Sequence, residues 1–292
     1  MKKLVFTLAT CCIMCACEQK TETNPFFTEF RTEYGAPDFD KIKIEHYEPA
    51  FLKGIEEQNA EIKAIVESRE TPGFENTIVA LDNSGRTLAR VKGVFYALTE
   101  ADTNDEMSAL SEKIAPVLSE HNDNIYLNQD LYKRVAAVWQ QEQEGKITLT
   151  TEQHRLLDRY YKAFIRSGAG LDAGKQNRLR EINKELSTLA ITFSNHVLNE
   201  NNAYRLVIDN EAELAGLPEW VKTGAAEEAK AVGKEGKWLF TLQNSSRLPL
   251  LQYADNRELR KDIYEAYINR GNNGDANDNK EILKKIICLL YT

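Results

Sequence analysis

The chain has 292 residues, of which 42% are hydrophobic and 28% are charged, and its formal net charge is −8. This balance is that of a globular protein, and the length allows one large domain or two ordinary ones. An acidic chain without a basic run beyond its first residues lacks the surface of a nucleic-acid binder, so we predict no nucleic-acid partner.

Residues 1–17 have the pattern of a secretory signal. Lys2 and Lys3 precede an apolar stretch that is too short to cross a bilayer. The segment 14–17, Met-Cys-Ala-Cys, resembles the cleavage box of bacterial lipoproteins, in which Cys17 becomes the acylated first residue. The alternative is an ordinary cleaved signal in which the cysteines are only small apolar residues. We expect a signal peptide over 1–16, lipidation at Cys17, membrane attachment through that lipid, a tether over 17–30, and a location on the bacterial cell envelope, on its periplasmic or cell-surface side.

Apolar residues spaced by three and four predict amphipathic helices along most of the remaining chain. The predicted helices cover about 46–68, 74–98, 107–118, 131–139, 156–165 and 179–197. The fifth ends at the glycine-containing segment 168–170, which we expect to terminate the helix with positive backbone φ angles.

The pattern changes near residue 204. Two short β-prone runs, 204–208 and 238–242, enclose a small helical stretch near 218–232 and predict a hairpin or small sheet. Asn256 is the expected N-cap of a helix that contains Leu259 and Ile263. The predicted fold class is therefore all-α, mainly helical, with a small β-hairpin or sheet insertion near residues 204–243.

The last predicted helix has an apolar face from Ile282 to Leu290, with no glycine or proline after it. An apolar stripe of this kind needs a partner surface to cover it. We therefore expect the sequence to be a fragment, or a truncated reading, of a longer protein.

No catalytic or metal-binding motif is complete in the sequence. A zinc hydrolase usually supplies two histidines one helical turn apart, with a glutamate beside the first. The histidines of this chain are His46, His121, His154 and His196. No two of them have that spacing, and the pairs His154–Asp158 and His196–Glu200 are more typical of solvated charge partners than of metal ligands.

Other catalytic motifs are also missing. The sequence contains no GxSxG elbow and no glycine-rich phosphate loop. Four of the five cysteines lie in residues 1–17, so no internal disulfide framework is expected. Cys288 lies on an apolar helix face, where we interpret it as a small buried hydrophobe rather than a nucleophile.

Several segments in fixed order resemble one family. They are Asn24-Pro25, FDKI at 39–42, HYEPAF at 46–51, PGFENTI at 72–78, RYYKAFIRSGAGL at 159–171, Asn183 with Glu185-Leu186, EGKWLFTLQ at 235–243 and NRELR at 256–260. Together they resemble the thimet oligopeptidase family of zinc metallopeptidases, and within it the peptidyl-dipeptidase, or dipeptidyl carboxypeptidase, branch. The resemblance covers the chain from about residue 24 to the last helix.

The resemblance implies a mostly helical enzyme whose deep channel admits short peptides and which releases their C-terminal dipeptides. In that family the two histidines of an HExxH helix and a later glutamate bind zinc, and the motif glutamate activates water. This chain has no matching positions, so we assign no catalytic residue and no metal ligand to it and expect zinc in the full-length enzyme only. The implied organisation is an N-terminal helical domain over 31–200 and the start of the catalytic region over 201–292, truncated before the zinc motif.

The matched residues are expected to be structural. His46 should cap or pack a helix start, and six aromatic residues should belong to the core. These aromatic residues are Phe51, Phe95, Tyr160, Tyr161, Phe193 and Trp238. Two other interpretations stay open: a non-catalytic helical envelope lipoprotein that binds peptides or a partner protein, and a decayed gene product.

Overall fold

A computed structural model describes residues 24–292, so the predicted signal peptide and Cys17 lie outside the described residues. The helices are α1 (Tyr47–Glu67), α2 (Ala80–Asp82), α3 (Arg86–Ala101), α4 (Asp105–Tyr126), α5 (Gln129–Gln143), α6 (Thr151–Arg166), α7 (Ala173–Ala203), α8 (Glu219–Ala231), α9 (Asn244–Tyr253), α10 (Arg257–Ile268) and α11 (Lys280–Leu290). The strands are β1 (Leu206–Ile208) and β2 (Trp238–Phe240). Shorter turns of helix are η1 (Pro25–Phe27), η2 (Glu33–Gly35), η3 (Phe39–Lys41), η4 (Ile44–His46), the π-helix η5 (Phe74–Val79) and η6 (Glu211–Leu214). The predicted all-α class with a small β insertion is confirmed.

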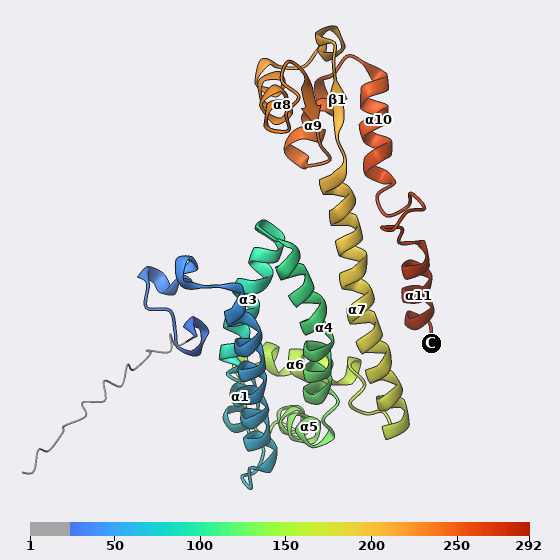
Figure 1. The fold of residues 1–292 in the computed structure, drawn as a ribbon. Coiled ribbons are helices and arrows are strands. Elements are labelled where there is room, and N and C mark those ends of the chain that lie inside the picture. The colour runs from blue at the N-terminus through green and yellow to red at the C-terminus, as the bar shows by residue number, and fades with distance from the viewer. Residues whose placement is uncertain (1–23) are drawn as a thin grey trace, which may run out of the picture.

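The long helix α7 joins two groups of elements (Figure 1). Helices α1 to α6 form one group, and β1, β2, α8, α9 and α10 form the other. Helix α11 returns beside α7. The domain boundary predicted after residue 200 therefore falls inside α7, close to its end.

The first group contains two buried clusters. In one, α1 packs on α3, and the rings of Phe51 and Phe95 meet edge to face with centroids 5.3 Å apart. In the other, α5 packs on α6, and Leu131, Leu157 and Phe164 are fully buried. These clusters show why the apolar periodicity predicted the helices, because each stripe faces a neighbouring helix.

The second group has its own core around the two strands. β1 and β2 are antiparallel, with Val207 opposite Leu239. Helix α8 packs against β2, and Phe240, Leu250 and Ile263 are buried between the strands and α9 and α10. The predicted hairpin or sheet is confirmed, and Asn256 caps α10 by accepting the backbone N–H of Glu258 at 3.0 Å.

The second predicted helix, over 74–98, is wrong as a continuous element. The chain forms η5 and α2, turns, and begins again at α3. Gly85 lies in the turn at φ +72°, in the left-handed region, and donates its N–H to Glu61 Oε2 at 2.7 Å. Apolar residues continue at helical spacing through the break, because the segment before it buries Ile78 and Leu81 in one cluster and α3 buries Leu88 and Val91 in the other. Periodicity therefore did not reveal the turn.

Two smaller expectations need correction. Of the segment 168–170, only Gly168 has a positive φ, +89°. Cys288 is exposed and not buried, because α11 packs mainly against α7 within residues 24–292 and buries none of its residues. No helix in that described range combines the length and apolarity that a membrane span requires.

Candidate functional site

The four histidines lie apart and have separate structural roles. His46 accepts the backbone N–H of Lys43 on Nδ1 at 3.0 Å, so it caps the start of η4, as expected of a residue at a helix start, and makes no side-chain cap to α1. His121 is buried on α4, where its Nε2 lies 2.7 Å from Oε1 of Gln58 on α1. Burial lowers the pKa of His121, and the charge of Lys92 lowers it further.

The other two histidines bind groups from outside their own helices. His154 Nδ1 lies 2.7 Å from Glu142 Oε1, whereas Asp158 pairs with Lys162. The i,i+4 pair at 154 and 158 is therefore not formed. His196 Nδ1 lies 2.9 Å from Oδ1 of the buried Asn279.

The side chains present do not fit the zinc site that the family resemblance implies. Among residues 24–292, no group of three or more His, Cys, Asp or Glu side chains is arranged to hold a metal ion. Zinc in a peptidase needs three such ligands around one point, and these histidines belong to different parts of the fold.

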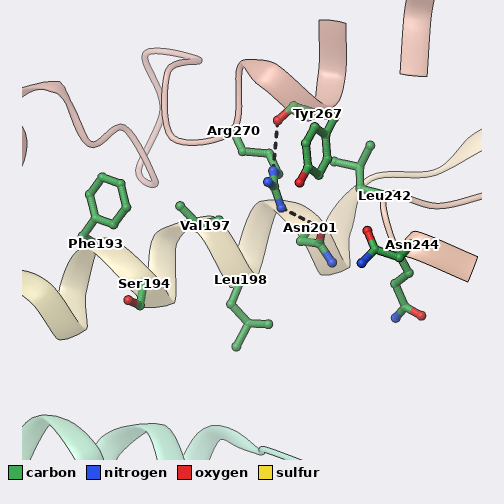
Figure 2. Close-up of a pocket in the computed structure, with 10 residues that line it drawn as sticks. Phe193, Ser194, Val197, Leu198, Asn201, Leu242, Asn244, Tyr267 and Arg270 are labelled. Atoms are coloured by element: carbon green, nitrogen blue, oxygen red, sulfur yellow. Dashed lines mark hydrogen bonds between the residues drawn. The ribbon is translucent and has the colours of Figure 1, made fainter. Parts of the chain in front are cut away.

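The candidate site is a pocket of about 530 Å³ between α7, the start of α9 and the end of α10, which we call the α7–α10 pocket (Figure 2). Its lining residues are Phe193, Ser194, Val197, Leu198, Asn201, Leu242, Gln243, Asn244, Tyr267 and Arg270. Phe193, Val197 and Leu198 form an apolar wall along α7 and are only half-buried. Phe193 is thus a pocket residue rather than the core residue that was expected.

The other aromatic residues behave as predicted. Phe51 and Phe95 are completely buried. Tyr160 and Tyr161 are half-buried and pack on the α5–α6 core, and Trp238 packs in the same way on the core around the strands.

The polar side of the α7–α10 pocket is built around Arg270. Its Nε donates to the carbonyl of Tyr267 at 3.0 Å, and its Nη1 donates to Asn201 Oδ1 at 3.0 Å (Figure 2). The guanidinium carbon lies 3.9 Å from the centre of the Tyr267 ring, a cation–π distance. These contacts hold the guanidinium at the edge of the pocket.

A second guanidinium contacts the same ring. Arg247 lies 3.6 Å from the centre of Tyr267 and donates from Nη2 to Asn244 Oδ1 at 2.6 Å. Within residues 24–292, neither Arg247 nor Arg270 has a carboxylate within 4.0 Å. Positive charge is therefore concentrated here without an acidic partner, although the whole chain is acidic.

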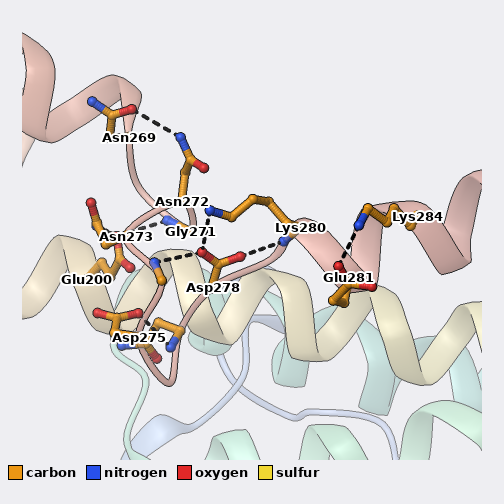
Figure 3. Close-up of polar contacts among 12 residues, drawn as sticks. Glu200, Asn269, Gly271, Asn272, Asn273, Asp275, Asp278, Lys280, Glu281 and Lys284 are labelled. Carbon is orange, nitrogen blue, oxygen red and sulfur yellow. Dashed lines mark hydrogen bonds and ion pairs between the residues drawn. The ribbon is translucent and has the colours of Figure 1, made fainter.

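The loop between α10 and α11 is fastened to α7 beside this pocket (Figure 3). Glu200 Oε2 accepts the backbone N–H of Gly271 at 2.9 Å and the side-chain amide of Asn273 at 2.8 Å. Asn279 donates its amide to the carbonyl of Phe193 at 3.1 Å, and its backbone N–H to the carbonyl of Gly271 at 2.7 Å. These bonds fix the residue that follows Arg270, and so fix where α10 ends.

Sequence reasoning considered Glu200 only with His196, one turn away. In the structure the two side chains bind different residues of the 271–279 loop and do not form a site together. Arg270, Asn201 and Asn244 were not singled out. The one available signal was the run of Gly, Asn and Asp after residue 270, which indicates a loop with many side-chain to backbone bonds.

Comparison with known proteins decides the family. The chain is 38% identical to the dipeptidyl carboxypeptidase of Escherichia coli over 267 residues, which cover 91% of this chain and 39% of that protein. The Salmonella typhimurium dipeptidyl carboxypeptidase is also 38% identical over 91% of the chain, and oligopeptidase A of the same organism is 32% identical over 92%. The chain belongs to the thimet oligopeptidase family of peptidases. It spans 39% of the length of each of these relatives, and no family model matches it.

In this member of the thimet oligopeptidase family, the segments that carry the resemblance lie mainly at element ends. Residues 46–51 begin α1, 159–171 include the end of α6 and the turn at Gly168, 235–243 contain β2, and 256–260 begin α10. Such positions determine where helices start, stop and cross. The resemblance therefore describes the scaffold, and one of its segments, 235–243, contributes Leu242 and Gln243 to the lining of the α7–α10 pocket.

Proposed function

We propose that this chain is the N-terminal part of a zinc-dependent peptidyl-dipeptidase, which hydrolyses short peptides and releases their C-terminal dipeptides. The observation that carries the proposal is the 38% identity to two dipeptidyl carboxypeptidases over 91% of the chain. The matching region is 39% of those proteins, which leaves most of their length for the residues that perform the reaction.

The structure is consistent with a scaffold role for this part. The described residues offer no ligand set for zinc. Three apolar side chains of α11 are exposed, with Leu283, Ile287 and Leu290 at 43%, 54% and 67%. In the larger helical enzyme that we propose, the remainder of the protein would pack on this surface. Alone, the chain should not cleave peptides.

The purified product of the whole locus tests the proposal. We expect its reading frame to encode an HExxH motif, and the protein to contain about one zinc per molecule and to release dipeptides until a chelator is added. The 292-residue chain, assayed beside it, should be inactive. Chelator-sensitive cleavage by the 292-residue chain, or a whole product without an HExxH motif, would sink the proposal.

We further propose that the protein is lipid-anchored on the bacterial cell envelope through Cys17, on the periplasmic or cell-surface side. The support is the sequence of residues 1–17 alone. Cells grown with a labelled fatty acid should label the protein, and Cys17→Ala should abolish the label while Cys15→Ala retains it. Equal labelling of the two variants would contradict lipidation at Cys17.

A further inference from the structure

The α7–α10 pocket presents hydrogen-bond donors that the chain itself does not use. Arg270 donates from Nε and Nη1 to groups of the protein, and its Nη2 has no partner among residues 24–292. The Oδ1 atoms of Asn201 and Asn244 accept from Arg270 and Arg247, which orients both carboxamides and leaves their Nδ2 donors available. Three donors therefore border one cavity, one from α7, one from the start of α9 and one from the turn after α10.

The charge of the pocket matches these donors. None of its ten lining residues is acidic, and Arg270 is charged. Glu200, the acidic residue next to Asn201, is turned to the loop by its bonds to Gly271 and Asn273. A ligand group that accepts several hydrogen bonds and carries negative charge would complement this wall, and a carboxylate has both properties.

The apolar residues of α7 that line the pocket indicate the rest of the ligand. Phe193, Val197 and Leu198 are half-buried and line the cavity from α7. An apolar side chain that enters the 530 Å³ cavity would cover them and remove apolar surface from water. A carboxylate and an apolar side chain on neighbouring atoms together describe the last residue of a peptide.

We propose that the α7–α10 pocket binds the C-terminal carboxylate of a short peptide, with Arg270, Asn201 and Asn244 as the donors and the α7 wall as the contact for an apolar last side chain. The choice of a peptide as the ligand rests on the proposed function. The pocket would hold a substrate or a released dipeptide by its free C-terminal end.

Calorimetric titration of the purified full chain tests this proposal, with N-acetyl-Ala-Phe as the probe and the same dipeptide carrying a C-terminal amide as its control. We expect the acid to bind and the amide to bind at least about tenfold more weakly, because the amide lacks the charge that Arg270 recognises. Equal affinity for acid and amide, or no binding of the acid, would overturn the proposal.

Two substitutions, each with a control, test whether the peptide binds in the α7–α10 pocket. Arg270→Gln should weaken binding of the acid about tenfold or more, whereas replacing Arg257, an exposed arginine at the start of α10, by Gln should leave it unchanged. Arg270 also donates to Asn201, so Arg270→Gln changes more than the contact with the ligand. A second variant therefore leaves the hydrogen bonds of Arg270 in place. Ser194→Glu adds a negative charge at an exposed lining position and should abolish binding, and Ala190→Glu, exposed one turn earlier and outside the lining, should not.

Unchanged affinity in both Arg270→Gln and Ser194→Glu would show that the peptide binds elsewhere. If the 292-residue chain binds the probe at this site but the whole product of the locus does not, an internal acidic side chain fills the pocket and the proposal also fails. Failure of peptide binding at this pocket can be distinguished from failure of the proposed function. Zinc-dependent dipeptide release by the whole product is scored by a different assay, and it survives loss of this site.

Discussion

The carboxylate of Glu200 on α7 accepts the backbone N–H of Gly271 at 2.9 Å, across 71 residues of sequence. The same oxygen also accepts from Asn273, while the other oxygen is buried without a partner. Gly271 has φ +70°, and a Cβ there would lie 2.7 Å from Nδ2 of Asn279. One carboxylate oxygen thus holds a loop whose path only glycine permits, next to the arginine of the α7–α10 pocket.

Replacing Glu200 separates the role of its shape from that of its charge. Glu200→Ala should lower the free energy of unfolding by about 2–3 kcal/mol, because two buried donors lose their acceptor. Glu200→Gln keeps an acceptor oxygen and removes a buried charge, so its loss should stay within about 1 kcal/mol. Urea unfolding measures both, with the exposed Glu227→Ala as the control. Identical midpoints for the Ala and Gln variants would contradict the assigned role.

Gly54 sets the distance between α1 and α3. It is buried, and a Cβ at this position would lie 2.8 Å from both Cα and N of Leu88. Gly54→Ala should therefore lower the free energy of unfolding by about 1–3 kcal/mol, because the backbone of α3 must move. Gly93 on α3 has nothing within 4 Å of such a Cβ, so Gly93→Ala should raise it by roughly 0.5–1 kcal/mol through helix propensity. Thermal unfolding that shifts both variants in the same direction would refute the close crossing.

The pH dependence of stability should include a contribution from His121. Its pKa in the folded protein is lowered from 6.5, mainly by burial, so below about pH 6.5 the unfolded chain binds the proton more readily than the folded one. Stability is then lost as the pH falls from 6.5 toward the lowered folded pKa. Burial raises the pKa of Asp123 above 3.8, which has the opposite sign, and stability from its protonation appears as the pH falls toward 3.8.

His121 and Asp123 contribute to the pH dependence of stability with opposite signs, so the contribution of His121 can be tested. Between pH 7 and pH 5.5 the free energy of unfolding should fall in the unsubstituted chain, and the fall should be smaller in His121→Gln, which cannot bind that proton. Guanidinium unfolding at a series of pH values gives the slopes. His154→Gln, an exposed histidine beside Glu142, is the comparison. A slope unaltered by His121→Gln would show that another group titrates.

The fold was predictable where each helix pairs with its neighbours along one stripe. The helix predicted over 46–68 is α1, and the one predicted over 179–197 lies within α7. The break at Gly85 was missed because apolar residues at helical spacing occur on both sides of it, although they pack into different clusters. Helix α9 was missed because Pro249 lies inside it. In both cases the tertiary packing, rather than the local pattern, decides the element.

The sequence did not predict the α7–α10 pocket. Histidine spacing within a helix concerns residues of one element only, and it led to no metal ligand being assigned. The α7–α10 pocket depends instead on contacts such as that of Arg270 with Asn201, 69 residues apart. Spacing rules describe neighbours on one element and do not show which elements meet, so this site became visible only in three dimensions.

The apolar face of α11 should make the chain associate with itself. Leu283, Ile287 and Leu290 are exposed by 43%, 54% and 67%, and within residues 24–292 this helix packs mainly on α7. Contiguous exposed apolar groups bind one another in water. Because these side chains bury little in the monomer, their replacement should cost little stability.

The double substitution Ile287→Glu with Leu290→Glu should therefore reduce association, seen in sedimentation velocity as loss of the concentration-dependent larger species. The midpoint of thermal unfolding should change by no more than roughly 2 °C. Lys261→Glu changes the net charge of the chain by the same −2 at an exposed site on α10, so it separates general repulsion from loss of the apolar face. If Lys261→Glu disperses the larger species equally well, charge rather than the α11 face controls association. If the double variant unfolds much earlier, the face is already covered in the monomer.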